Sequence, residues 1–258
     1  MIIPEESATR ETWRVIAQRS SDIAQRLYQA MRAFCEAKRK GRKRCAEMSL
    51  IRRMQCNLKV VSILASLSYK KESLYFKFPV GLLLRSCLMD TIYAFYLHGM
   101  KAKEAEEEIE VMNKDYVKSL DERFDVYKDK VPDIGLSAAE TKSFYDLGCE
   151  DTFIQYLTYE MDGEKLKTRP IKNKDLRTAY DERPGNLNIA SMVEYVKTNT
   201  KHGCVVNRLN AYYRYFSQYE HFSEQGYGDS LAPFGDDNVS FPLAIDALEK
   251  GLRVIVKM

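Results

Sequence analysis

The chain has 258 residues, of which 45% are hydrophobic and 30% are charged, and its 40 basic residues nearly balance its 37 acidic ones. This composition excludes a disordered or fibrous chain and is typical of a globular protein long enough to bury a sizeable core. The balanced charge also excludes a surface that is basic all round, so a polyanion could be bound only by a local patch.

The first residues, MIIPEESATRETW, lack the basic start, apolar middle and small-residue cleavage site of a secretory signal, so we expect a cytoplasmic protein. The six cysteines form no C-x-x-C pair, which favours reduced thiols and predicts neither a disulfide nor a structural zinc site. No G-x-G-x-x-G, Walker A or G-x-S-x-G motif occurs, and we expect no metal and no cofactor.

Apolar residues recur at helical spacing in the first half of the chain. From Trp13 to Phe34 they return every three or four positions, which predicts an amphipathic helix of about 30 residues. Similar stripes run over 51–65 and over 109–127. Each stripe predicts a helix with one buried face.

The window 78–97, FPVGLLLRSCLMDTIYAFYL, is apolar nearly all round and about as long as a membrane span. It carries Arg85 and Asp90, each of which would cost about 2.5–3.5 kcal/mol in a bilayer, so we expect the central helix of a bundle and no membrane association. The two charges are about 140° apart around a helix and each needs a different partner.

The second half of the chain alternates helical patterns with a long polar stretch. Ser137 and Glu140 resemble a capping box that opens a helix to about residue 157. Residues 162–188 read as a loop with one short helix near Leu176, and an apolar pattern resumes at Ile189. A helix over 204–225 follows Gly203, and 241–257 is either a helix or a strand. The sequence predicts an all-α bundle of about six to eight helices, a single domain over 1–258 with a possible internal boundary at 160–188.

Polar residues line one face of the predicted 204–225 helix. Four of them fall on one side at 100° per residue: Arg214, Ser217, His221 and Glu224. An Arg can hold phosphate oxygens and a His can move a proton at neutral pH, so the strip is a candidate phosphodiester site. The alternative is a buried polar network that ties helices together.

The stretch RYFSQYEH resembles the R-x(4–6)-H motif of the HEPN superfamily (higher eukaryotes and prokaryotes nucleotide-binding). It is also similar to the Y-x3-S-x3-H signature, here Tyr213, Ser217 and His221, of a group of bacterial helical proteins in which an Arg-bearing apolar helix comes first. Arg85 lies on such a helix.

The HEPN resemblance implies a helical bundle, often a homodimer, that acts as a metal-independent endoribonuclease or binds nucleic acid or nucleotides, in many cases as a toxin or in phage defence. By position, Arg214 and His221 would be catalytic, with Arg214 on the phosphate and His221 in acid–base work. Tyr213, Ser217, Glu224 and Arg85 would support them. An antitoxin-like protein partner is a further option.

A second candidate region is a run of basic residues between the first and second predicted helices. The stretch KRKGRKR offers a patch able to collect phosphate backbone, or else a solvated helix junction: Lys38, Arg39, Lys40, Arg42, Lys43 and Arg44. Two functions therefore remain open. One is a metal-independent RNase or RNA-binding effector, and the other is a non-enzymatic helical interaction protein.

Overall fold

The computed structural model of the chain describes residues 4–36, 41–71, 76–109, 137, 139, 158–162, 165–169, 188–219 and 237–256. Its contacts divide the chain into two compact units. The first consists of Met1–Ala105 together with Leu187–Met258, and the second is Glu106–Asn186. The sequence placed a possible boundary at 160–188. The junction after Ala105 falls within the acidic run KEAEEEIE (103–110), which the sequence prediction did not use as a boundary.

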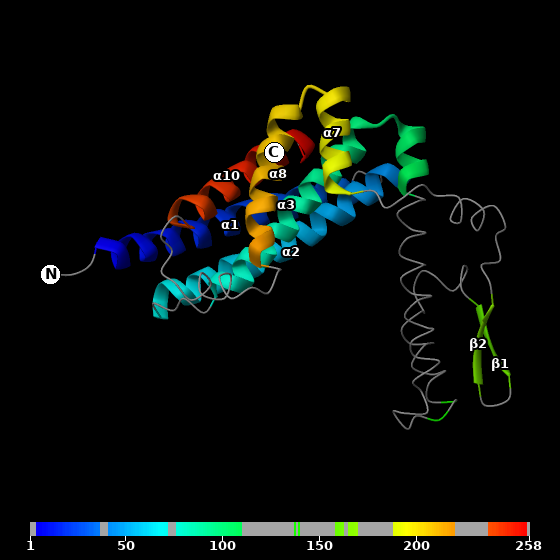
Figure 1. Ribbon diagram of the computed structural model, residues 1–258, viewed down its shortest axis with the longest axis horizontal. Helices are drawn as coiled ribbons and strands as arrows, with labels where there is room; N and C mark the ends of the chain where they lie inside the picture. Colours follow the sequence, from blue (N-terminus) through cyan, green and yellow to red (C-terminus); the bar gives the residue numbers. More distant parts are fainter. Residues whose placement is uncertain are drawn as a thin grey trace. The chain divides into compact units, whose positions relative to one another are not determined.

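The first unit is an all-α bundle, as the sequence predicts (Figure 1). A short helical stretch at 102–109 follows the third helix, and a 3-10 turn, η1, covers Ser217–Tyr219. The long helices are α1 (Pro4–Glu36), α2 (Arg42–Lys71), α3 (Lys77–Gly99), α7 (Ile189–Asn199), α8 (Gly203–Phe216) and α10 (Asp237–Val256).

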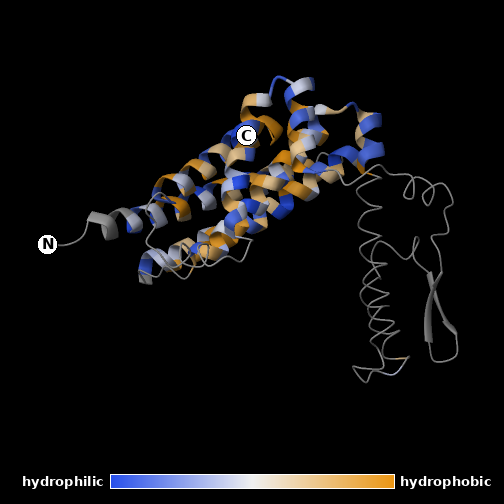
Figure 2. Cartoon of the chain, viewed as in Figure 1, coloured by the Kyte–Doolittle hydropathy of each residue, from blue (hydrophilic) through white to orange (hydrophobic). Residues whose placement is uncertain are grey.

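Helix α3 is the centre of the bundle, because α2, α7, α8 and α10 all pack against it. Its apolar side chains face in every direction and the neighbours bury most of them, among them Leu84, Leu88, Ile92 and Phe95. Figure 2 shows the hydrophobic colour gathered where these helices meet. Among the described residues α3 is the helix long and apolar enough to cross a membrane, but 67% of that window is buried inside the protein. The prediction of a central core helix is confirmed.

Helix α1 lies between α2 and α10. Its predicted apolar stripe is buried, from Trp13 through Leu27. The hydroxyl of Ser62 donates to the carbonyl of Ala17 at 2.8 Å, which fixes the antiparallel register of α1 and α2. On its other side, Arg19 of α1 pairs with Glu249 of α10 at 3.0 Å. The N-terminal and C-terminal helices are therefore neighbours.

The structure decides between the options for one late element and shortens another. Residues 241–256 are helical, as part of α10, so the helix option is confirmed and the strand option is wrong. The predicted 204–225 helix begins at Gly203 but its α-helical part ends at Phe216, where η1 takes over. Phe216 is fully buried and Tyr219 nearly so, because both rings pack on Phe241. The 3-10 turn places the Tyr219 ring beside that of Phe216, against α10.

The second unit contains an antiparallel strand pair, β1 (Thr158–Asp162) and β2 (Lys165–Arg169). Thr158 lies opposite Arg169, and Asp162 lies opposite Lys165. The loop predicted over 162–188 is therefore wrong for 165–169. Of the predicted helices over 109–127 and after Ser137, the structure describes Ile109 and Ala139, both helical; the rest of these helices and the one near Leu176 lie outside the described residues.

Candidate functional site

The candidate site lies at the C-terminal end of α8, where the helix packs against α3 and α10. Phe216 points into the bundle and its ring meets that of Phe241 edge to face, with centroids 4.9 Å apart. Anchoring this face turns Arg214 outward to solvent and leaves Tyr213 and Ser217 half-buried. The sequence pattern placed aromatics around this helix, and the fully buried ring of Phe216 sets its orientation.

Arg85 of α3 reaches the same end of α8. Its Nε donates to Ser217 Oγ at 3.2 Å, and its Nη2 donates to the hydroxyl of Tyr213 at 3.1 Å. The guanidinium also lies over the Tyr213 ring, 4.9 Å from the centroid, a cation–π arrangement. The structure thus brings together three of the supporting residues named from the sequence, from two different helices.

Ser217 acts here as a structural hydroxyl. Its Oγ donates to the carbonyl of Tyr213 at 2.9 Å while it accepts from Arg85. A hydroxyl has one proton to donate, and that proton is directed at the helix backbone. The geometry therefore supports a positioning role for Ser217. The other two residues of the predicted strip, His221 and Glu224, lie outside the described residues.

Arg214 is the exposed cation of this region. Its guanidinium makes no hydrogen bond and no ion pair with any residue that the structure describes. The neighbouring Tyr213 is held by Arg85, so the backbone that carries Arg214 is fixed from the α3 side. An uncompensated guanidinium on a rigid helix end is a group to which an anion can bind in bidentate fashion.

Behind α8 lies a buried charged network that sequence analysis missed. The ammonium of Lys77 pairs with Asp237 at 2.5 Å, and both side chains are almost completely buried. The same carboxylate accepts hydrogen bonds from the hydroxyls of Tyr215 and Tyr219, the latter at 3.2 Å. Burial, followed by the hydrogen bond to Asp237, raises the pKa of Tyr215 to about 12. The network ties α3, α8 and α10 together directly below the candidate site.

The two charges of the central helix have different partners, as predicted. Asp90 is fully buried, and its carboxylate accepts a hydrogen bond from Nε of Arg53 at 2.7 Å. It accepts a second, shorter hydrogen bond from Nη2 of the same guanidinium. Burial raises the pKa of Asp90, and the hydrogen bond from Arg53 opposes that rise without cancelling it. This pair joins α2 to α3 and takes no part in the α8 site.

The predicted basic patch is only partly described. Lys38, Arg39 and Lys40 lie outside the described residues, and only the backbone of Arg42 is described. Lys43 donates to the carbonyl oxygens of His98 at 3.3 Å and Met100 at 2.7 Å, at the end of α3. Arg44 pairs with Glu47 at 2.7 Å and lies over the ring of Phe34. Two residues of the patch thus make contacts that hold the helix ends.

Replacing Lys43 by Met should lower the free energy of unfolding by about 1 kcal/mol, because the carbonyls at the end of α3 lose a charged donor that is partly exposed to water. Lys59→Met is the matched control, since Lys59 is an exposed lysine of the same helix with no hydrogen bond to a described residue. Chemical denaturation of the two variants measures the difference. Equal stabilities would show that Lys43 is a solvated surface cation.

Among the described residues no three His, Cys, Asp or Glu side chains gather as metal ligands would. Comparison with protein-family models, with curated proteins and with solved structures gives no match to this chain.

Proposed function

We propose that this protein is a metal-independent endoribonuclease or RNA-binding effector of the HEPN type, acting in bacterial defence or as a toxin. The observation that carries the proposal is the position of Arg214, exposed and without an ion pair among the described residues, one residue from the fixed Tyr213. A guanidinium in that position can hold a phosphate by two hydrogen bonds. Because the guanidinium of Arg214 is positively charged, it can offset the single negative charge of a phosphodiester without a metal ion.

In this proposal the 2′-hydroxyl of the RNA attacks the adjacent phosphorus and the P–O5′ bond breaks. Acid–base transfer through His221 removes the proton from the 2′-hydroxyl and delivers one to the leaving 5′-oxygen, which leaves a 2′,3′-cyclic phosphate and a free 5′-hydroxyl. An imidazole with an ordinary pKa of about 6.5 exists in both protonation states near neutrality, as such catalysis requires. Arg85, Tyr213 and Ser217 orient the end of α8. A second copy of the chain completes the site, in keeping with the homodimers of the family that the signature resembles.

The test is cleavage of a mixed RNA pool in EDTA by the wild-type protein and by Arg214→Ala and His221→Ala. Both substitutions should reduce cleavage at least about 100-fold, because His221→Ala removes a positioned acid–base group and Arg214→Ala removes a charged donor from the phosphate. Lys201→Ala is the matched control, because Lys201 is an exposed cation just before α8 with no partner among the described residues. Activity that survives in His221→Ala would contradict the catalytic role.

A second function is favoured by a separate observation, the contacts of Arg85 with Tyr213 and Ser217 inside the bundle. In this alternative the strip is a packing network of a non-enzymatic interaction protein. His221→Ala would then lower stability by about 1–3 kcal/mol, the cost of an unsatisfied buried group, and RNA would remain intact with every variant. Melting temperatures recorded beside the cleavage assay distinguish the two functions.

A further inference from the structure

Helix α2 carries a row of exposed apolar side chains that the bundle does not use. Cys56, Val60, Ile63 and Leu67, here called the α2 stripe, fall within an arc of about 60° on an ideal helix. Val60 is 43% exposed, Ile63 is 51% exposed and Leu67 is 36% exposed. A single exposed aliphatic residue is ordinary, but a row aligned along one helix is typical of an interaction site.

The α2 stripe is separate from the face of α2 that builds the core. That inner face, from Ile51 through Leu58 to Ala65, is completely buried against α1 and α3. The hydroxyl of Ser62 faces α1, and Arg53 reaches α3 at the other edge. The stripe therefore lies on the outer side of the helix, between these two edges.

The exposed charged residues that α2 itself places beside the stripe are all basic. Helix α2 contains eight basic residues and one acidic residue, Glu47, which is buried and paired with Arg44. Beside the stripe, Arg52, Lys59 and Lys70 are exposed. The surface is thus an aliphatic row with a basic rim, complementary to a partner whose apolar side chains are flanked by carboxylates.

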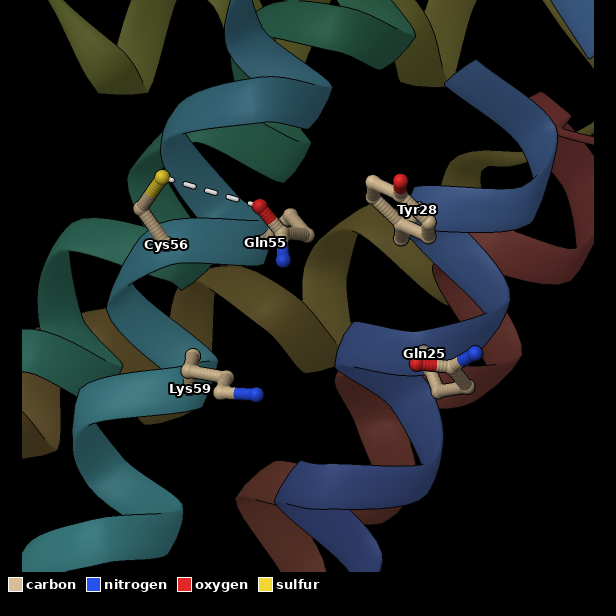
Figure 3. A pocket seen from close by; sticks show the side chains of 5 residues that line it. All are labelled: Gln25, Tyr28, Gln55, Cys56 and Lys59. Atoms are coloured by element: carbon tan, nitrogen blue, oxygen red, sulfur yellow. Dashed lines mark hydrogen bonds between the residues drawn. The ribbon is translucent and has the colours of Figure 1, made fainter. Parts of the chain in front are cut away.

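A hollow of about 440 Å³ opens between α1 and α2 next to Cys56 (Figure 3). Its lining comes from both helices: Gln25, Tyr28, Gln55, Cys56 and Lys59. Figure 3 shows Lys59 extending from α2 toward α1, and Cys56 turned toward Gln55. Tyr28 is 47% exposed at this position. A depression with an aromatic wall can receive an anchoring side chain of a bound helix.

We propose that the α2 stripe, its basic rim and the adjoining hollow bind an acidic amphipathic helix of a protein partner. An aliphatic row at helical spacing matches the apolar stripe of another helix. RNA bases stack on successive aromatic side chains, whereas the stripe has none and the hollow has one, Tyr28. A bilayer surface would also accept a basic amphipathic helix, but it has no side chain to fill the hollow. This inference goes beyond the proposed function and does not depend on cleavage of RNA.

The test uses a fluorescein-labelled synthetic helix with Leu on one face and Glu on the other, and a second peptide with Lys in place of Glu. Fluorescence anisotropy should show binding of the Glu peptide to the wild-type protein, and no binding of the Lys peptide. Ile63→Glu should weaken binding of the Glu peptide at least about tenfold, because it removes apolar contact and adds a like charge. Lys59→Glu should weaken it as well, with the stripe itself intact.

The matched control is Leu243→Glu, which puts the same charge at an aliphatic residue of α10 that is 37% exposed. It should leave binding unchanged. Circular dichroism of each variant checks that the bundle is folded.

Several results would overturn the proposal. If the wild type and both charge variants bind the Glu peptide with the same affinity, the peptide binds elsewhere on the protein. If the wild type does not bind the Glu peptide at all, the proposal is wrong. Binding of duplex RNA or of phosphatidylserine vesicles, lost in Ile63→Glu, would assign the surface to a different class of partner. A wild-type dimer that Ile63→Glu converts to a monomer would assign it to a second copy of this chain.

Discussion

Asp237→Ala is expected to lower the free energy of unfolding by about 3–5 kcal/mol, which is the range observed when one member of a buried ion pair is removed. Lys77 is 2% exposed, so its ammonium would lose a partner 2.5 Å away without gaining water in exchange. Tyr215 and Tyr219 would lose their acceptor in the same change. The residue also stands in the first turn of α10, where a carboxylate favours the helix dipole. Urea denaturation measures the effect.

The matched control is the double variant Lys77→Met with Asp237→Ala. It removes both charges, and replacing a buried ion pair by apolar groups is often nearly neutral. The double variant should therefore be more stable than Asp237→Ala alone. Should the single and the double variant be equally destabilised, the cost would come from the tyrosine hydrogen bonds and the ion pair would contribute little. Absorbance titration of the tyrosines gives a second readout, because the raised pKa of Tyr215 should fall toward its ordinary value without Asp237.

The second large effect is expected for Arg53→Ala, which leaves the carboxylate of Asp90 buried without its partner. Asp90 is completely buried, whereas the Arg53 side chain is 54% exposed. Water can enter where the guanidinium was, so we expect a loss of about 2–4 kcal/mol at neutral pH, below the full cost of breaking an enclosed pair. Thermal and chemical denaturation at one pH give the first measurement.

The loss in Arg53→Ala should grow with pH. Burial already raises the pKa of Asp90, so the native state holds this proton to a higher pH than the unfolded chain does. The contribution of Asp90 to the free energy of unfolding of the wild type therefore falls as the pH rises from the ordinary pKa of a carboxyl group through the raised pKa of Asp90. Without Arg53 the pKa of Asp90 rises further, so stability falls over a wider range of pH. At a pH below the ordinary carboxyl value both proteins carry a neutral Asp90, and the difference in stability should be smallest there.

Asp90→Asn supplies the control for this prediction. In the Arg53→Ala background it removes the buried charge, so the double variant should regain stability at neutral pH and lose the dependence on pH. A double variant as unstable as Arg53→Ala would place the cost in lost packing of the arginine stem.

The helices were predictable because their signals are local. The stripe from Trp13 to Phe34 repeats over many turns, and the 78–97 window is apolar on all sides, so each sequence segment defines its own buried surface. Helix α10 was ambiguous because its local signal is short: a run such as LRVIVK fits a strand or a helix equally well. Packing on α1, α3 and α8 decides in favour of the helix.

The strand pair β1–β2 did leave a local signal. Tyr159, Met161 and Leu166 alternate with polar residues on either side of Asp162-Gly163, a dipeptide typical of hairpin turns. Charge and glycine in the surrounding segment favoured the interpretation as a loop.

The charged pairs left no such signal. Lys77 and Asp237 lie 160 residues apart in the sequence, and nothing near either residue indicates the other. At the candidate site, helical spacing could place Tyr213 and Ser217 on one face, but it could not show that Arg85 would contact both of them.

The division of the first unit into Met1–Ala105 and Leu187–Met258 means that two separate stretches of chain encode one bundle. Helices α7, α8 and α10 of the later stretch pack on α3, and α10 also packs on α1. The loop-closure entropy of the residues between them grows only with the logarithm of their number. In evolutionary terms, the second unit therefore occupies a position where an ancestral helical protein could gain or exchange an inserted module while its core remained the same.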